Sequence, residues 1–173
     1  LLFTPARLRD LDLANRIVVS PMCQYSAVDG TATDWHLVHY GSLALSGAGL
    51  VILEATHVES RGRITHGCLG LYADAHEEAL TRIITFVRER TDAKVGILLS
   101  HSGRKGSARL PWIDRGRPLT VEENAWTTMA PSALPFADGW PPPRAMDGED
   151  LQTTLEAHVE AVRRAERVGF DLI

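Results

Sequence analysis

The residues best suited to chemistry follow three short apolar runs of the sequence. Directly after the first run comes the segment 20–25 (Ser-Pro-Met-Cys-Gln-Tyr), which places a thiol, an amide and a phenol within a short stretch. Such a segment offers one soft, redox-sensitive group, Cys23, beside several hydrogen-bonding groups. A plainer alternative, a proline turn with a buried cysteine, explains the same residues and stays open from spacing alone.

Two further polar clusters follow the second and third apolar runs. Residues 54–57 (Glu-Ala-Thr-His) precede a loop with two arginines, which can hold an anion or simply lie on the surface. Residues 100–105 (Ser-His-Ser-Gly-Arg-Lys) form a basic loop, in which His101 and Arg104 can bind a polar ligand or anchor the chain that follows. The carboxyl ends of parallel strands are where α/β folds place their ligand sites.

The elements that must position these clusters alternate between apolar runs and helical periodicity. Four runs are typical of buried strands: residues 17–19, 50–53, 95–99 and 170–173. Between the second and third runs, Leu80, Ile83, Ile84 and Val87 recur at helical spacing. A third helix, opened by Asp147 and Asp150 and ended by Gly169, has the predicted apolar stripe Leu151, Leu155, Val159 and Val162. This alternation predicts an α/β fold with a parallel sheet.

One long segment, residues 100–144, interrupts the alternation. It holds seven of the nine prolines, so we expect it to be mostly loop. Loops of this length inside a compact domain are usually functional or disordered. Trp112, Trp126 and Trp140 all lie in it, and they can either fasten the loop to the sheet or line a pocket for a flat ligand.

Composition narrows the class of protein. The 173 residues are 45% hydrophobic and 23% charged, and a net charge of −4 gives no basic surface for nucleic acid or an anionic membrane. Two cysteines outside any C-x-x-C pair argue against a disulfide scaffold or a structural zinc site. Because no run of about 18 apolar residues and no charged-then-apolar leader occurs, we expect a cytoplasmic protein without a membrane partner.

Other chemical motifs are weak. Neither a G-x-G-x-x-G loop nor a P-loop sequence follows the first strand, so a Rossmann or P-loop phosphate site has no support. Among seven histidines only His36 and His39 lie close together, on a first helix that Asp34 is predicted to cap and that begins at Trp35, and we expect no carboxylate on that face. The sequence therefore predicts no metal site.

Short motifs spread along the whole chain carry a resemblance to a known family. The strongest is the segment 20–25, and the others include Asn15-Arg16-Ile17-Val18, Asp34-Trp35-His36, Glu54-Ala55-Thr56, Gly62-Arg63-Ile64-Thr65, His101-Ser102-Gly103-Arg104-Lys105 and Ala130-Pro131-Ser132-Ala133. In this order they resemble the Old Yellow Enzyme family of FMN-dependent ene-reductases. Because a cysteine follows Pro-Met, the segment resembles the thermophilic-like branch of this family, which is close to bacterial xenobiotic reductases and NADPH dehydrogenases.

The resemblance implies a partial FMN-binding (β/α)8 barrel over residues 1–173. The chain would be the N-terminal half of a TIM barrel, with about four βα units and a long loop after the third strand. It would form a single domain truncated before the fifth strand, because a complete barrel needs ~250 residues. The flavin would lie at the carboxyl ends of the strands.

The resemblance also assigns roles to individual residues. The segment along the flavin would comprise Ser20, Pro21, Met22 and Cys23. Cys23 would lie near the reactive edge, where a polarizable thiol tunes the flavin. Ala55 would contact the flavin pyrimidine through its backbone, and Tyr25 would donate a hydrogen bond to the substrate. Cys23 and Tyr25 are therefore the expected catalytic residues.

The implied reaction is a ping-pong hydride transfer. NADPH or NADH would reduce the flavin at N5, and the reduced flavin would deliver hydride to the β-carbon of an α,β-unsaturated carbonyl. The protein would orient this small-molecule enone and polarise its carbonyl. A half barrel would leave open sheet edges. We therefore expect a homo-oligomer, aggregation, or dependence on residues outside this half.

Two departures from the family pattern affect this interpretation. The family commonly has a glutamine on the third strand that pairs with the flavin pyrimidine, whereas this chain has Leu98. Leucine offers no hydrogen bond, and an unpaired buried polar edge costs roughly 1–3 kcal/mol. The paired histidines that grip the substrate carbonyl in the family follow the fourth strand, beyond Ile173.

Two alternatives remain from the sequence. One is a Schiff-base aldolase-type barrel that uses Lys94 or Lys105, the only lysines. The other is a non-catalytic half-barrel remnant or fragment, which Leu98 and the missing histidines favour.

Overall fold

A parallel three-stranded sheet forms the centre of the computed structural model, which describes all residues 1–173. Strand β3 (Val18–Val19) pairs with β4 (Leu50–His57), and β4 pairs with β5 (Lys94–Ser100). Each strand therefore lies next to the strand that follows it in the sequence, as in the consecutive βα units of a barrel.

The fourth apolar run lies beside β5 but forms only the beginning of a strand. The Asp171 amide donates to the Val95 carbonyl at 2.8 Å, and the Ile97 amide donates to the Leu172 carbonyl at 2.9 Å. Gly96 and Leu172 form a single parallel bridge. The predicted position and direction of this strand are thus observed, without a full ladder of hydrogen bonds.

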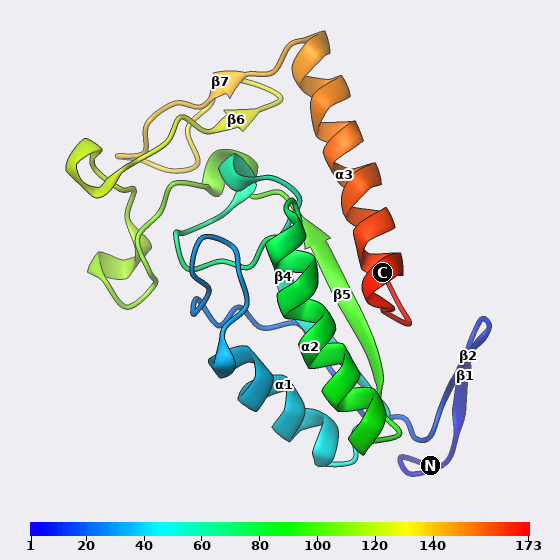
Figure 1. The fold of residues 1–173 in the computed structure, drawn as a ribbon. Helices are drawn as coiled ribbons and strands as arrows, with labels where there is room; N and C mark the ends of the chain where they lie inside the picture. Colours follow the sequence, from blue (N-terminus) through cyan, green and yellow to red (C-terminus); the bar gives the residue numbers. More distant parts are fainter.

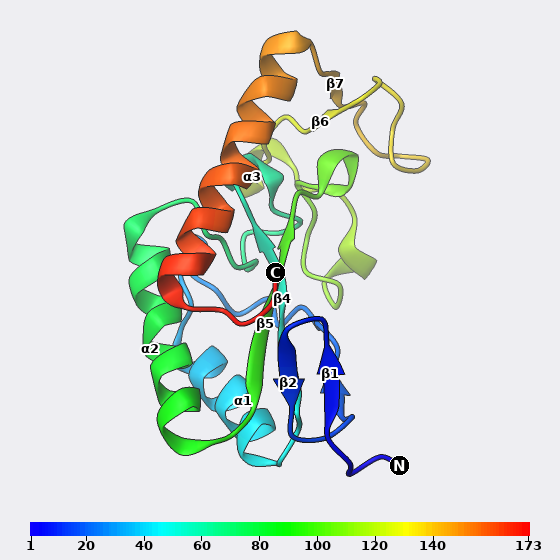
Figure 2. The same cartoon turned by 90° about the vertical axis from the view of Figure 1, so that its right-hand side faces the viewer.

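Three helices cover one face of the sheet: α1 (Asp34–Leu45), α2 (Asp74–Arg90) and α3 (Gly148–Val168). Figures 1 and 2 show them side by side on the same side of β4 and β5, with the opposite face free of helices. This one-sided arrangement is an arc of a barrel rather than a doubly wound sheet, in which helices cover both faces. None of the helices combines the length and apolarity needed to cross a membrane.

Helix α2 supplies the largest part of the core. Its predicted stripe is buried throughout, with Leu80, Ile83, Ile84 and Val87 at most 2% exposed. These side chains pack with Leu53 and other residues of β4 and β5 in one cluster. Periods of three and four residues place them on a single face, so the sequence pattern predicted this packing correctly.

The apolar stripe of α3 does not pack against the rest of this chain. Leu151, Leu155, Val159 and Val162 are 58%, 57%, 42% and 41% exposed, and the helix instead buries Ala161, Ala165 and Val168. Small alanines let α3 approach closely, while arginines join it to α2 through pairs such as Arg164 Nη1 to Glu77 Oε2 at 2.9 Å. Periodicity identified an apolar stripe without showing which face the neighbouring elements cover.

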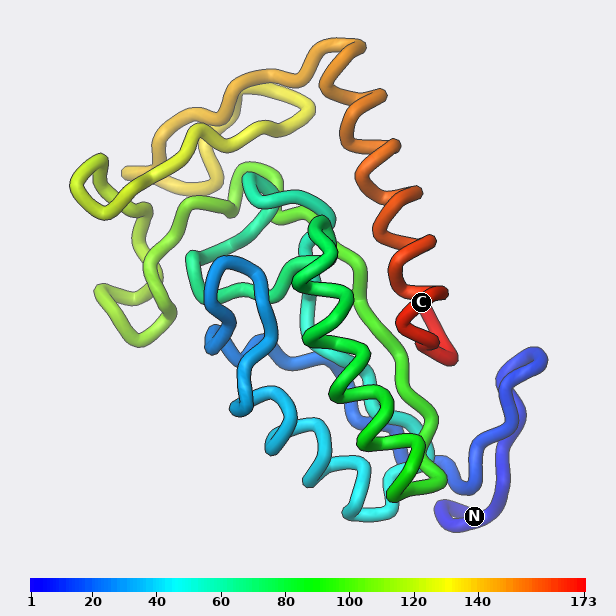
Figure 3. The backbone as a smooth tube through the Cα atoms, in the orientation of Figure 1, coloured from blue at the N-terminus to red at the C-terminus, as the bar shows by residue number.

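Two further regions complete the chain. An antiparallel hairpin of β1 (Ala6–Leu8) and β2 (Leu11–Leu13), which the sequence did not predict, lies near the end of the sheet where β5 begins (Figure 1). The segment after β5 is loop and short 3-10 turns, as expected, apart from β6 (Met129–Ala130) and β7 (Arg144–Ala145). Figure 3 shows this segment extending from the carboxyl ends of the strands.

Candidate functional site

The three clusters of polar residues meet at the carboxyl ends of β3, β4 and β5. Ala55 lies directly opposite Leu98 in the register of β4 and β5. The register shifts between Leu53 and Ala55, so Glu54 occupies an irregular position in the strand. At this irregularity the side chains of the two strands have different surroundings: Glu54 is buried against α1, whereas Leu98 is 43% exposed.

The loop after β3 is fixed mainly through Gln24. Its backbone amide donates to Glu54 Oε2 at 2.9 Å, and its side-chain amide donates to the Met22 carbonyl at 2.8 Å. Gln24 Oε1 accepts a hydrogen bond from Trp35 Nε1 at 3.2 Å. Within this loop Cys23 is half-buried and Met22 is 48% exposed, so both present surface near the strand ends.

Tyr25 adopts a constrained backbone conformation. Its φ of 53° lies in the left-handed region, which is unfavourable for a residue with a side chain. Gly67, in the loop after β4, crosses the Tyr25 carbonyl so closely that a Cβ at Gly67 would lie 2.5 Å from that oxygen. Only glycine permits this approach, and the Gly67 carbonyl accepts the Ala27 amide at 3.0 Å.

Burial keeps the two candidate catalytic side chains protonated. Burial, together with the nearby Cys23 and Cys68, raises the pKa of Tyr25 to about 12. Burial also raises the pKa of the Cys23 thiol, and the charge of Glu54 acts in the same direction. At neutral pH the loop therefore offers a phenol that can donate a hydrogen bond and an uncharged, polarizable thiol.

The long segment after β5 reaches back to this loop. The ring of Trp112 meets Tyr25 edge-on, with 5.8 Å between ring centroids and 80° between planes. Arg109 closes the turn that carries Trp112, donating to Glu123 Oε1 at 2.9 Å and to Asp114 Oδ2 at 2.8 Å. Sequence reasoning named Trp112 but missed this contact, because nothing in the spacing indicates which residue a loop tryptophan touches.

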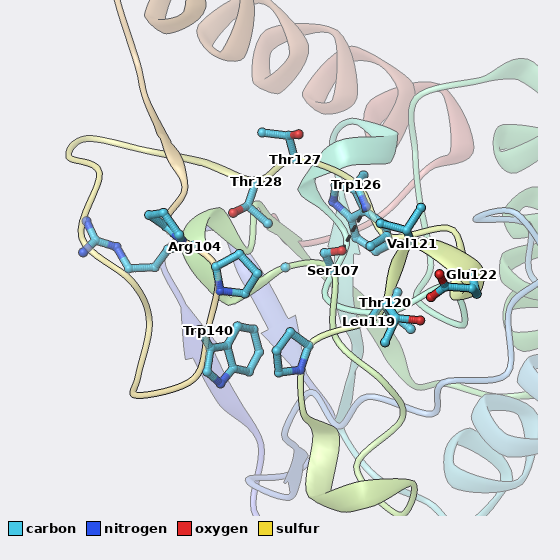
Figure 4. Close-up of a pocket in the computed structure, with 15 residues that line it drawn as sticks. Arg104, Ser107, Leu119, Thr120, Val121, Glu122, Trp126, Thr127, Thr128 and Trp140 are labelled. Carbon is cyan, nitrogen blue, oxygen red and sulfur yellow. Dashed lines mark hydrogen bonds between the residues drawn. The ribbon is translucent and has the colours of Figure 1, made fainter.

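The other two tryptophans lie after Trp112 in this segment and have different surroundings. Trp126 fastens the loop, since its Nε1 donates to the Arg61 carbonyl at 2.9 Å and its amide donates to Ser107 Oγ at 3.0 Å. Trp126 and Trp140 also line a hollow of about 530 Å³ (Figure 4). Arg104 borders this hollow but is already bonded to the Leu134 carbonyl and Ser132 Oγ, so it acts as an anchor.

The histidines and lysines do not form the alternative sites. No group of three or more histidine, cysteine or acidic side chains is arranged to hold a metal ion. A carboxylate does lie near His36, although it comes from β4 and not from the helix: Glu54 Oε1 is 3.5 Å from His36 Nε2. Lys94 pairs with Leu50 at the start of the strands, away from the clusters, and Lys105 lies over the Phe136 ring.

The residues at the strand ends fit the ring of a flavin better than its polar edge. Exposed Met22 and Leu98 and half-buried Cys23 and Ala55 provide an apolar, polarizable surface on which a flat ring can stack. Leu98, directly beside Ala55, cannot bond to the pyrimidine of that ring. The fit therefore depends on stacking and on backbone groups at this edge.

An arc of consecutive βα units with polar groups gathered at the carboxyl ends of its strands defines part of a (β/α)8 barrel. The model of the NADH:flavin oxidoreductase / NADH oxidase family matches residues 1–173. The chain belongs to this family, which includes the Old Yellow Enzymes, and the aldolase alternative is excluded.

Individual relatives agree with the family assignment. The chain is 42% identical to an NADH:flavin oxidoreductase of Gibberella zeae and 40% identical to an NADPH dehydrogenase of Bacillus cytotoxicus, over 99% of its length. It covers 42% and 45% of those proteins, less than half of each. Among solved structures, morphinone reductase aligns with a TM-score of 0.80 at 27% identity, over 99% of this chain and 46% of that one.

An Old Yellow Enzyme from Pichia sp. aligns with a TM-score of 0.83 at 26% identity, over 99% of this chain and 44% of that one. These alignments confirm the predicted half of a TIM barrel. They leave the roles of Ser20, Pro21, Met22, Cys23, Tyr25 and Ala55 as predictions.

Proposed function

We propose that the protein containing this chain is an FMN-dependent NAD(P)H oxidoreductase that reduces the C=C bond of α,β-unsaturated carbonyl compounds. The observation that supports it most is the loop after β3, which holds Cys23 and Tyr25 beside Ala55 and Leu98 at the strand ends. The family description names NADH and flavin, and a morphinone reductase is described in complex with tetrahydroNAD.

FMN, when bound, supplies the acceptance of a hydride from NAD(P)H and its delivery to carbon. Tyr25 binds the substrate carbonyl as a neutral donor, because a pKa of about 12 keeps its hydroxyl protonated. Cys23 and Met22 would provide a polarizable and apolar surface for the ring. Ala55 would bind it through its backbone, while Leu98 would leave one polar edge without a side-chain partner.

The test is a visible spectrum of the purified full-length protein, followed by an assay of NADPH oxidation with a cyclic enone. We expect a yellow protein that releases FMN on denaturation and transfers reducing equivalents to the enone. Tyr25→Phe should lower kcat with the enone while the flavin spectrum remains. A colourless protein that does not bind added FMN would instead support the alternative of a non-catalytic half barrel.

Two accompanying expectations also remain predictions: that the protein is cytoplasmic and that it forms a homo-oligomer. Fractionation of cells that express the native gene checks the first. Light scattering of the full-length protein checks the second.

A further inference from the structure

Glu54 is an acidic side chain in an unusual place. It is 0% exposed at the carboxyl end of β4, and the nearest basic group is His36, whose Nε2 lies 3.5 Å from its Oε1. Burial lowers the pKa of His36 to about 4, so this imidazole carries no charge at neutral pH. A buried carboxyl group without a cationic partner is unfavourable for folding, so stability alone does not account for Glu54.

Each carboxyl oxygen of Glu54 accepts a hydrogen bond from a different element. Oε1 accepts the Tyr40 hydroxyl of α1 at 2.9 Å, and Oε2 accepts the Gln24 amide of the loop after β3 at 2.9 Å. The Glu54 amide in turn donates to the Tyr40 hydroxyl at 3.1 Å. Glu54 therefore links a helix, a strand and the loop of the candidate site through buried hydrogen bonds.

His36 extends this connection to the start of α1. The Thr33 amide donates to His36 Nδ1 at 3.0 Å, so the neutral ring carries its proton on Nε2, which faces Glu54 and has no other partner. His36 and Tyr40 are one helical turn apart, so both reach the carboxyl group from the same face of the helix. The Glu54 carboxyl group therefore accepts two hydrogen bonds, from Tyr40 and Gln24, and faces the protonated Nε2 of His36 at 3.5 Å.

The loop residue that Glu54 holds lies between the two candidate catalytic residues. The Gln24 amide belongs to the peptide plane that joins Cys23 to Gln24, so holding it fixes the direction of the Cys23 side chain and the point from which the chain continues to Tyr25. We propose that Glu54 is a positioning residue, which holds Cys23 and Tyr25 in their working orientation over the flavin site. This inference rests on the proposed function.

The test compares variants of the full-length, FMN-loaded protein. Glu54→Gln keeps the size of the side chain but replaces one acceptor oxygen with an NH2 group, so either Gln24 or Tyr40 loses its acceptor. We expect FMN to remain bound, the flavin reduction potential to shift, and the rate of enone reduction to fall about 10- to 100-fold, since small displacements in a site have effects of this size. Tyr40→Phe leaves the hydrogen bond between Gln24 and Glu54 intact. Its enone reduction rate should therefore lie between those of wild type and Glu54→Gln.

Asp150→Asn is the matched control. Asp150 is another buried carboxylate with a hydrogen-bonded partner, Arg144, but it lies at the start of α3 and touches no site residue. This variant should lose stability without a change in potential or enone rate. The proposal would be overturned if Glu54→Gln and Tyr40→Phe kept the wild-type flavin potential and enone rate. It would also be overturned if Asp150→Asn lost as much of the enone rate as Glu54→Gln. If Glu54→Gln fails to fold, Tyr40→Phe decides alone.

A second readout does not need the flavin. The pH dependence of Cys23 alkylation, followed by peptide mapping, reports the surroundings of the thiol, which faces Glu54, Cys68 and Tyr25. Because the charge of Glu54 raises the pKa of Cys23, Glu54→Gln should move the alkylation profile to lower pH, and Asp150→Asn should not. A wild-type protein without flavin refutes the proposed function, whereas wild-type enone rates in flavin-loaded Glu54→Gln and Tyr40→Phe refute the positioning role.

Discussion

Two regions reach the candidate site, and they are held in different ways. The loop after β3 is attached by buried hydrogen bonds, chiefly between Gln24 and the fully buried Glu54. The segment after β5 reaches the rest of the molecule through side chains such as Trp112 and Trp126, and arginine pairs nearer the surface brace it internally and to α3: Arg109 with Glu123 and Arg144 with Asp150. Buried hydrogen bonds in a packed core tolerate little displacement, whereas ion pairs near the surface are weaker and screened by salt.

This difference separates two tasks within one site. The loop after β3 carries the groups that would meet the flavin and the reacting atoms, which need a fixed geometry. The segment after β5 brings Trp112 to Tyr25 from outside, where some movement is compatible with the entry of a substrate. Under the proposed function, rigid positioning and adjustable access would therefore fall to different parts of the chain.

Gly67→Ala should break the buried attachment most severely. The new Cβ would lie 2.5 Å from the Tyr25 carbonyl, so one of the two backbones must move. We expect a loss of about 1–3 kcal/mol in the free energy of unfolding, typical of overpacking, and a much lower enone rate. Urea denaturation measures the first and the enone assay the second.

Gly148→Ala is the control for this prediction, because a Cβ at Gly148 meets nothing within 4 Å. It should leave both the stability and the enone rate close to wild type. Equal effects of the two substitutions would show that Gly67 is not held against Tyr25.

Trp112→Ala tests the outer attachment. An aromatic pair contributes about 0.5–1.5 kcal/mol beyond its buried area, so we expect KM for a bulky enone to change by roughly 2- to 10-fold. Because the loop after β3 is held independently, kcat and the flavin spectrum should stay near wild type. Trp112→Phe keeps a ring that can meet Tyr25 edge-on and should retain most of the wild-type KM, and a collapse of kcat in either variant would contradict separate roles.

The inner region was easier to predict from the sequence than the contacts that hold it. The segment 20–25 stood out because its residue types and order are unusual, and the α2 stripe because its periodicity is regular. Glu54 was visible only as part of a polar cluster after a strand, and its partners Tyr40 and Gln24 are separated from it by many residues. Which side chains meet across such distances depends on packing, and no local pattern encodes it.

The acid dependence of stability should show the contribution of the outer region. Hydrogen bonds from Arg144 hold the pKa of Asp150 well below its ordinary value of about 4. The pair therefore stabilises the fold fully above that ordinary value, and the stabilisation is lost as the pH falls through it toward the folded pKa. In urea denaturation, the free energy of unfolding of wild type should exceed that of Asp150→Asn at pH 7. The difference between the two should be smaller at pH 5 and smallest at pH 3.

Burial gives the stability contribution of Glu54 the opposite dependence on pH. Its pKa is raised, so it contributes less to stability as the pH rises through the range between the unfolded and folded values. The difference between wild type and Glu54→Gln should therefore favour wild type more at acidic than at neutral pH. Parallel pH profiles for the Asp150 and Glu54 variants would contradict the contrast between the two regions.

Leu155→Gln on α3 should have the smallest effect on stability. Its side chain is 57% exposed, and surface substitutions usually change the free energy of unfolding by less than about 0.5 kcal/mol. The buried counterpart on α2, Ile83→Ala, should lose about 2–5 kcal/mol because it leaves a cavity. The same substitution of Leu155 should reduce the binding of an apolar dye to the 173-residue chain, because the exposed stripe of α3 is an apolar surface. A large loss of stability in Leu155→Gln would mean that this stripe packs against the chain itself, and α3 would then belong with the buried region rather than with the outer one.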